Sequence, residues 1–147
     1  MGEKDYNAPM HSAEHILNGT MDKMFGCGRA FSSHVEKKKS KCDYHFNRLL
    51  TEEELRNIEN TVNGVIAQNL AVTEDFISKE EAEQQFNLSR LPESAGDTLR
   101  IIRIGDYDAC PCIGTHVQNT AEIGRFKIIS ADYKDDVLRI RFKREDL

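Results

Sequence analysis

The sequence lacks any apolar run that approaches the roughly 20 residues needed to cross a bilayer, so a membrane-spanning helix is excluded. Its N-terminal segment, MGEKDYNAPMHSAEH, also lacks the apolar core of a secretion signal. We therefore expect a cytoplasmic protein with no membrane partner. In that compartment the four cysteines do not indicate a disulfide framework. Cysteines that accompany histidines there more often bind metal or take part in catalysis.

An excess of positive charge is also missing, because 20 Lys and Arg face 25 Asp and Glu, for a net charge of -5. This balance excludes a strongly basic polyanion binder, although local basic clusters can still contact nucleic acid. One cluster is Lys37, Lys38 and Lys39 with Lys41, and a second contains Arg139, Arg141, Lys143 and Arg144. Taken alone, each is more typical of a solvated turn or a polar strand face.

Internal repeats, low-complexity tracts and long linkers are absent too, so we expect residues 1–147 to form a single domain. A helix is predicted over residues 9–25. The apolar residues at helical spacing, which should form a stripe that faces the core, are Met10, Ala13, Leu17, Met21 and Met24. Thr51 and Glu54 form a capping box that opens a second long helix, which should end near Leu70.

Alternating apolar residues and flanking turn residues predict strands over residues 30–36, 41–47, 72–77, 99–104, 125–133 and 137–143. Ser78 with Glu81 suggests a short helix towards residue 86, residues 87–97 are expected to form a loop, and residues 105–108 a turn. Helices and strands alternate without regular βαβ units. We therefore predict an α+β fold with a largely antiparallel sheet packed with two main helices.

Two histidines, His11 and His15, lie four residues apart on the first predicted helix. Side chains at this spacing share one face about 5–6 Å apart, close enough to bind one cation. They line up with Asn18 and Asp22, away from the apolar stripe. Seen alone, this spacing is more often a pair of surface or partly buried histidines.

A second pair, Cys112 and His116, stands in the loop sequence Cys-Ile-Gly-Thr-His after a predicted strand. Together the two pairs offer three imidazoles and one thiolate, a nitrogen-rich set that suits zinc. Cys110 is a rival to Cys112 as a ligand. We favour Cys112, because its spacing to His116 matches the helical pair, and leave Cys110 as a neighbour or spare ligand.

Four further residues offer ligand atoms outside these pairs. Cys27 and Cys42 are expected to pack in the interior. His34 and His45 are expected to be strand residues with hydrogen bonds, although either could line a pocket.

The segment His11-Ser-Ala-Glu-His15, followed by Cys112-Ile-Gly-Thr-His116, resembles the editing domain of alanyl-tRNA synthetases. It is similar above all to the freestanding AlaX proteins that edit in trans. Residues 43–47, 50–55, 58–59, 62–63, 66 and 117–128 also match, so the resemblance covers nearly the whole chain. The first motif begins almost at the N-terminus, so we expect the shortest AlaX type. Threonyl-tRNA synthetases carry a related domain with the same ligand pattern, but Gly-Thr-His and Glu-Ile-Gly favour the alanyl branch.

The resemblance implies zinc-dependent hydrolysis of a seryl or glycyl ester on the tRNA for alanine. Zinc would either activate water or orient and polarise the ester. We favour the second role, because four protein ligands leave no open coordination position on the ion. The tRNA would contact the basic residues Lys37, Lys38, Lys39, Lys41, Arg139, Arg141 and Lys143. Ile113 departs from the family pattern, which has glycine there, and this narrows the backbone freedom of the loop.

A site that hydrogen-bonds the serine hydroxyl can reject alanine strongly, because alanine would leave buried polar groups unpaired. The candidate catalytic residues for this contact are Ser32, Ser33 and Thr115, with Asn18 less favoured. Glu14 lies between the helical histidines, but helix capping or solvent exposure explains it better than a general-base role. Two other functions stay open: a non-catalytic zinc-stabilised module that binds tRNA or protein, and a zinc hydrolase acting on other small esters or amides.

Overall fold

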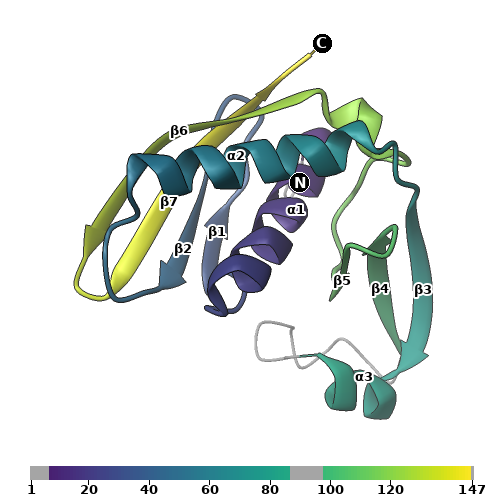
Figure 1. Ribbon diagram of the computed structural model, residues 1–147. Coiled ribbons are helices and arrows are strands. Elements are labelled where there is room, and N and C mark those ends of the chain that lie inside the picture. The colour runs from purple at the N-terminus through teal and green to yellow at the C-terminus, as the bar shows by residue number, and fades with distance from the viewer. Residues whose placement is uncertain (1–6, 87–97, 147) are drawn as a thin grey trace.

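A computed structural model describes residues 7–86 and 98–146 of the chain (Figure 1). The loop expected over residues 87–97 lies outside this range. In chain order the elements are α1 (Ala8–Phe25), β1 (Ser32–His34), β2 (Ser40–His45), α2 (Glu52–Ala67), β3 (Val72–Ser78), α3 (Lys79–Gln85), β4 (Thr98–Ile104), β5 (Asp108–Pro111), the 3-10 helix η2 (Thr120–Ile123), β6 (Arg125–Lys134) and β7 (Val137–Glu145).

The strands form two antiparallel sheets, ordered β1-β2-β7-β6 and β3-β4-β5. The predicted α+β class with antiparallel pairing is confirmed, but the strands divide between two sheets instead of one. The expected turn after β4 is tighter than predicted, and Asp108 already belongs to β5. Gly105 at φ 48° makes this turn possible, and Tyr107 N–H donates to the Ile104 carbonyl across it.

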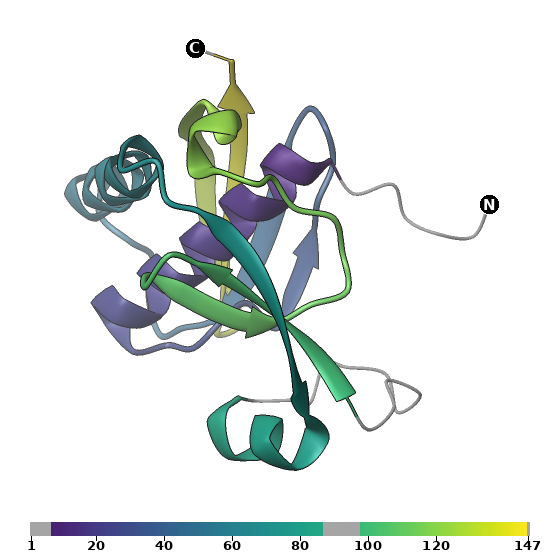
Figure 2. The same cartoon turned by 90° about the vertical axis from the view of Figure 1, so that its right-hand side faces the viewer.

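Helix α1 lies between the larger sheet and the smaller one (Figures 1 and 2), and it contacts α2, β5, η2 and β7. Asn7 caps its start, and Gly26 in the left-handed conformation ends it. Because structure surrounds it, every residue from Met10 to Met21 is buried. Met10, Ala13, Leu17 and Met21 of the predicted core stripe are buried as expected, whereas Met24, assigned to the same stripe, is exposed.

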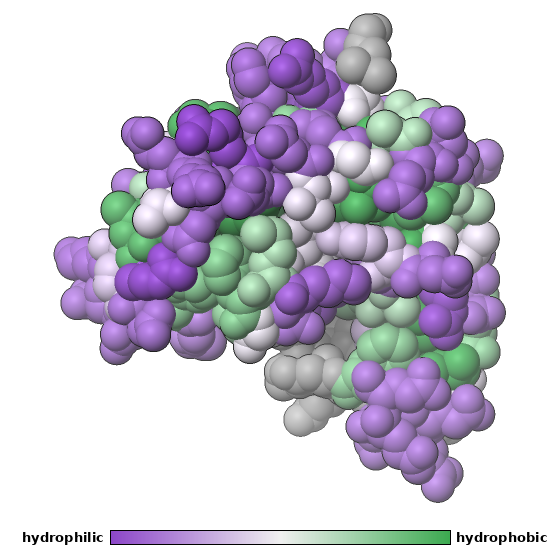
Figure 3. Space-filling model, viewed as in Figure 1, coloured by the Kyte–Doolittle hydropathy of each residue, from purple (hydrophilic) through white to green (hydrophobic). Residues whose placement is uncertain are grey.

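Helix α2 follows its predicted pattern more closely. The capping box of Thr51 and Glu54 is present, and Ile58, Val62 and Val65 are buried against the core. Hydrophilic side chains gather over its outer face and over α3 (Figure 3). No helix in residues 7–86 or 98–146 is long and apolar enough to cross a membrane.

Candidate metal centre

The two predicted ligand pairs converge in space. Helix α1 supplies His11 and His15, and the loop after β5 supplies Cys112 and His116; one ligand atom from each lies within 4.8 Å of all the others. The imidazole centroids are 5.0 Å apart for His11 and His15, 4.1 Å for His11 and His116, and 4.4 Å for His15 and His116. These four residues, called the ligand cluster below, could hold one metal ion.

Arg100 on β4 fixes the loop that carries Cys112. Its Nη1 donates to the carbonyls of Cys112 and Gly114, at 3.2 and 2.7 Å, and its Nε donates to Glu74 at 2.6 Å. In return, the Cys112 N–H donates to the Arg100 carbonyl. Ile113 is 77% exposed, so its side chain does not occupy the space among the ligands. The loop therefore accommodates isoleucine where the family pattern has glycine.

Hydrogen bonds orient two of the imidazoles. His11 Nδ1 donates to the Thr115 carbonyl at 3.0 Å, and its Nε2 faces Cys112 Sγ at 3.4 Å. His116 Nδ1 lies 2.9 Å from Ser12 Oγ, whereas its Nε2 is buried and has no hydrogen-bond partner among the described residues. A buried nitrogen without a partner is costly, and a metal ion would satisfy it.

His15 is held differently. Its Nδ1 is also buried without a hydrogen-bond partner in the described part of the chain, and it lies 3.9 Å from Asp108 Oδ2. Asp108 in turn accepts two hydrogen bonds from Arg29, at 2.7 and 3.2 Å. Sequence reasoning missed Asp108 and Ser12, because neither lies at a spacing that marks it as a partner of a histidine.

Burial sets the charge of the ligand cluster. It lowers the pKa of His11, lowers that of His15 well below the usual value, and, with the nearby His11, lowers that of His116 to about 3. The three imidazoles are therefore neutral at pH 7, the form that binds metal. Burial also raises the pKa of the Cys112 thiol, and a bound cation would favour its thiolate. Three imidazoles and one sulfur match the donors of zinc sites.

Glu14 is buried beside the ligand cluster, so the expectation of capping or solvent exposure was wrong. Its Oε2 accepts from Asn18 Nδ2 at 3.0 Å and from Ser33 Oγ at 2.9 Å. Its Oε1 lies 3.9 Å from Nε2 of both His11 and His15. Ser33 of β1 contacts this face of α1 through its hydrogen bond to Glu14, and a helical pattern alone does not reveal such a contact.

The three candidate catalytic residues occupy different environments. Ser33 on β1 faces Glu14, as its hydrogen bond shows. Ser32 on the same strand is exposed. Thr115 is exposed and touches the ligand cluster through its carbonyl, which accepts from His11. Of the three, Ser33 is therefore the one whose hydroxyl contacts a group beside the ligand cluster.

The remaining cysteines and histidines stay outside the ligand cluster. Cys110 Sγ contacts the Pro111 carbonyl, and burial raises the pKa of its thiol to about 12. Cys42 is buried in the core, as predicted, and Cys27 packs against it. His34 lies 3.2 Å from Glu36, and His45 stacks on Phe31 with centroids 4.0 Å apart.

The basic residues differ in their pairing. Lys37, Lys38 and Lys39 are exposed in the turn between β1 and β2. A cavity of about 230 Å³ beside them is lined by His34, Glu36, Lys39, Ser40, Lys41 and Arg141. On β7, by contrast, Arg139 binds Asp43 through two hydrogen bonds of 2.7 and 2.9 Å, Arg141 pairs with Asp132, and Lys143 lies 3.6 Å from Glu145.

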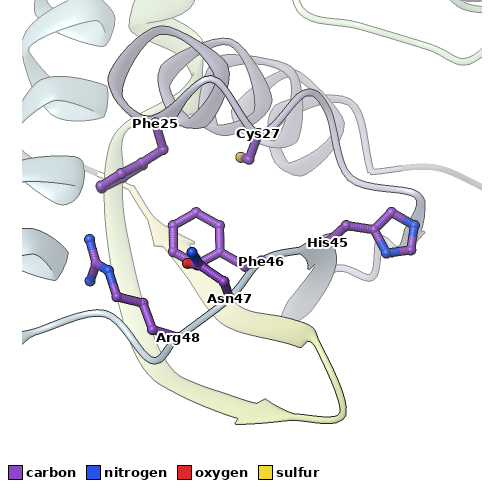
Figure 4. Close-up of a pocket in the computed structure, with 6 residues that line it drawn as sticks. All are labelled: Phe25, Cys27, His45, Phe46, Asn47 and Arg48. Carbon is purple, nitrogen blue, oxygen red and sulfur yellow. The ribbon is translucent and has the colours of Figure 1, made fainter.

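A larger cavity, of about 540 Å³, lies at the C-terminal end of α1 (Figure 4). It is lined by Phe25, Cys27, His45, Phe46, Asn47 and Arg48, and no member of the ligand cluster contributes to it. The rings of Phe25 and Phe46 meet edge to face, and Arg48 is paired with Glu54. This cavity is thus separate from the ligand cluster.

The sequence is similar to that of known proteins. Residues 99–141 fit the family described as the threonyl and alanyl tRNA synthetase second additional domain. The chain is 37% identical to an alanine–tRNA ligase of Fervidobacterium nodosum over 121 residues, which is 82% of this chain and 14% of that protein. It is 34% identical to the alanine–tRNA ligase of Aeropyrum pernix over 141 residues, which is 92% of this chain and 16% of that protein. It is 37% identical to the alanine–tRNA ligase of Staphylothermus marinus over 137 residues, which is 90% of this chain and 15% of that protein.

The chain thus spans between 14 and 16% of the length of these relatives, although they cover most of this chain. Its ligand cluster forms from the two motifs that predicted the relationship. The chain therefore belongs to the AlaX-like family of alanyl-tRNA synthetase editing domains.

Proposed function

We propose that the protein is a zinc-dependent deacylase that hydrolyses the seryl or glycyl ester of mischarged tRNA for alanine, acting in trans. The observation that carries the proposal is the convergence of His11, His15, Cys112 and His116 within 4.8 Å of one another in a chain of this family. Editing of this kind is needed because binding alone discriminates poorly between small side chains. The cytoplasm, where tRNA is charged, is the expected location.

The ligand cluster would hold zinc, which supplies Lewis-acid chemistry that orients and polarises the ester or lowers the pKa of a water molecule. Ser12 and the Thr115 carbonyl hold two of the imidazoles in place. The Ser33 hydroxyl donates to Glu14, and its oxygen stays able to accept a hydrogen bond from a serine substrate. Alanine lacks that hydroxyl, so alanyl esters would bind less well than seryl esters; this contact does not act on glycyl esters, which lack the hydroxyl too. Ser32 and Thr115 are secondary candidates for the same contact.

The acceptor end of the tRNA would bind along the turn between β1 and β2. Lys37, Lys38 and Lys39 are exposed there, and Lys41 lines the adjoining cavity of about 230 Å³. Arg139, Arg141 and Lys143 would contribute less, because a phosphate would compete with the carboxylates that already bind them. A chain with net charge -5 should bind tRNA in a salt-sensitive manner.

The direct test combines zinc analysis with deacylation of Ser-, Gly-, Ala- and Thr-charged tRNA for alanine, with and without a chelator. We expect one zinc per chain, rapid loss of Ser- and Gly-tRNA, and intact Ala-tRNA. His15→Ala should abolish zinc binding and activity, whereas His45→Ala, which changes a histidine outside the ligand cluster, should preserve both. Intact Ser- and Gly-tRNA after incubation with the zinc-loaded protein at low salt would overturn the proposal.

A second candidate is a structural zinc module that binds tRNA or protein without catalysis. It is favoured by the presence of four protein donors, because structural zinc sites are closed in this way and catalytic ones keep an open position. His11→Ala distinguishes the two functions. A folded but inactive variant supports the deacylase, and an unfolded one supports the structural module.

A further inference from the structure

Glu14 is a buried carboxylate that a hydrogen-bond network holds rigidly. Its Oε2 receives hydrogen bonds from Asn18 and Ser33. Asn18 is fixed in turn, since its Oδ1 accepts from the Tyr44 hydroxyl at 2.8 Å and from the Ala30 N–H at 3.0 Å. Helix α1, β1 and β2 therefore all contribute to its position. A network of this kind sets the direction of the second oxygen, Oε1.

Oε1 points towards the ligand cluster, and within the described part of the chain no hydrogen-bond donor reaches it. Its distance of 3.9 Å to Nε2 of His11 and of His15 is too long for a hydrogen bond. Among residues 7–86 and 98–146, both hydrogen bonds that Glu14 accepts from side chains end on Oε2. Glu14 itself is not one of the four clustered ligands. A buried carboxylate oxygen in this state is stabilised when a ligand brings a donor to it.

The charge of the surroundings narrows the identity of that donor. Nε2 of each neighbouring histidine lies 3.9 Å from Oε1, beyond hydrogen-bond distance. Arg29 is engaged with Asp108 through two hydrogen bonds. The Glu14 side chain keeps 8% of its surface exposed, so a small group can reach it. A cationic donor would satisfy both the hydrogen bond and the charge, whereas a water molecule would satisfy only the first.

We propose that Glu14 binds the α-ammonium group of the aminoacyl ester, so that the site selects esters with a free, charged amino group. The inference rests on the proposed deacylase function and names a specificity-determining residue for it. In an aminoacyl ester the ammonium nitrogen is two bonds from the ester carbonyl carbon. A carbonyl placed at the ligand cluster therefore puts this nitrogen within reach of Oε1. Ser33, bonded to the other oxygen, would then lie near the substrate side chain.

Binding of stable analogues tests the proposal without relying on turnover. The probes are 3′-serylamido-adenosine and its counterpart in which a hydroxyl replaces the α-amino group, titrated calorimetrically into zinc-loaded protein. We expect the wild type to bind the amino probe about 10- to 100-fold more tightly, the value of a charge-assisted hydrogen bond. Glu14→Gln should bind both probes equally, Glu14→Asp should keep part of the preference, and the exposed control Glu53→Gln should keep all of it.

The wild-type measurement alone can overturn the inference, so the test does not depend on whether the variants fold. It does so if the wild type binds the two probes with equal affinity, or binds neither. A preference that survives in zinc-loaded Glu14→Gln would overturn it as well. Hydrolysis of glycyl-tRNA and of glycolyl-tRNA, which carries a hydroxyl in place of the amino group, separates this inference from the deacylase proposal. Equal hydrolysis of both supports the deacylase and contradicts the role of Glu14. Selective binding of the amino probe without any hydrolysis supports Glu14 and contradicts the deacylase.

Discussion

Ser12 Oγ and His116 Nδ1 lie 2.9 Å apart, although 104 positions separate them in the sequence. The same oxygen accepts the Val117 N–H at 3.1 Å, and Ser12 is completely buried. One hydroxyl thus ties α1 to the loop that carries the second half of the ligand cluster. Because it occupies Nδ1, this contact directs Nε2 of His116 towards the other ligands.

We expect Ser12→Ala to weaken zinc binding about 10- to 100-fold, the usual effect of removing a group that orients a metal-binding histidine. The free energy of unfolding should fall by about 1–3 kcal/mol, since the Val117 N–H and His116 Nδ1 would lose their buried partner. Chelator competition measures the affinity, and urea denaturation of the metal-free protein measures the stability.

Thr61→Ala is a suitable control for this variant. It also removes a hydroxyl from a helix, but Thr61 Oγ1 donates to the Asn57 carbonyl of its own helix, on the exposed side of α2. Zinc affinity should not change. If Ser12→Ala binds zinc as tightly as the control, the hydroxyl does not orient His116.

The ligand cluster could be predicted from sequence because each of its pairs is local. His11 and His15 need only the geometry of one helix, and Cys112 and His116 only a short loop. The environment of Glu14 could not be predicted in the same way, because spacing along a helix says nothing of what covers each face. Every residue of α1 from Met10 to Met21 is buried, so Glu14 lies beside the histidines and is not exposed.

The same distinction between local and distant contacts applies to the fold. Thr51 and Glu54 cap α2 as predicted, because capping depends on residues three positions apart. The division into two sheets depends instead on which strands pair at a distance, and alternation of apolar residues does not encode partners. Strand β5 forms because Asp108–Pro111 pairs with β4. The residues just before it have the composition of a turn, and for that reason the sequence did not predict where the strand begins.

Stability of the metal-free protein should decrease as the pH falls. The pKa of His116 is about 3 when folded, against 6.5 as a usual value, so the unfolded chain binds more protons between these limits. The stabilisation is complete above pH 6.5 and is lost as the pH falls towards 3, at up to about 1.4 kcal/mol per pH unit for each such histidine. The pKa values of His11 and His15 shift in the same direction.

Urea denaturation at several pH values measures this effect. His116→Asn, which cannot titrate, should show a shallower decline between pH 6.5 and 4 than the wild type. Identical slopes for the two proteins would mean that His116 takes up its proton without unfolding.

The salt dependence of tRNA binding should distinguish the two basic clusters. Lys38 is exposed in the turn between β1 and β2, whereas Arg139 is bound to Asp43 through two hydrogen bonds. Lys38→Ala should reduce the slope of log K against log salt by about 0.7–0.9, the value for one phosphate contact. Arg139→Ala should leave the slope nearly unchanged. Filter binding at several salt concentrations measures both, and a larger loss of slope for Arg139→Ala would place the tRNA on β7 instead.

Two helical glycines provide a matched test of packing around the ligand cluster. A Cβ on Gly19 in α1 would lie 2.8 Å from Asp108 Oδ1, whereas a Cβ on Gly64 in α2 would meet nothing within 4 Å. Asp108 cannot move aside cheaply, because Arg29 binds both of its oxygens. Gly19→Ala should therefore destabilise the protein by about 1–3 kcal/mol. Gly64→Ala should stabilise it by up to about 1 kcal/mol, since alanine favours helix. Urea denaturation of both variants checks the contrast, and a stabilising Gly19→Ala would show that the pair of Arg29 and Asp108 is not rigid.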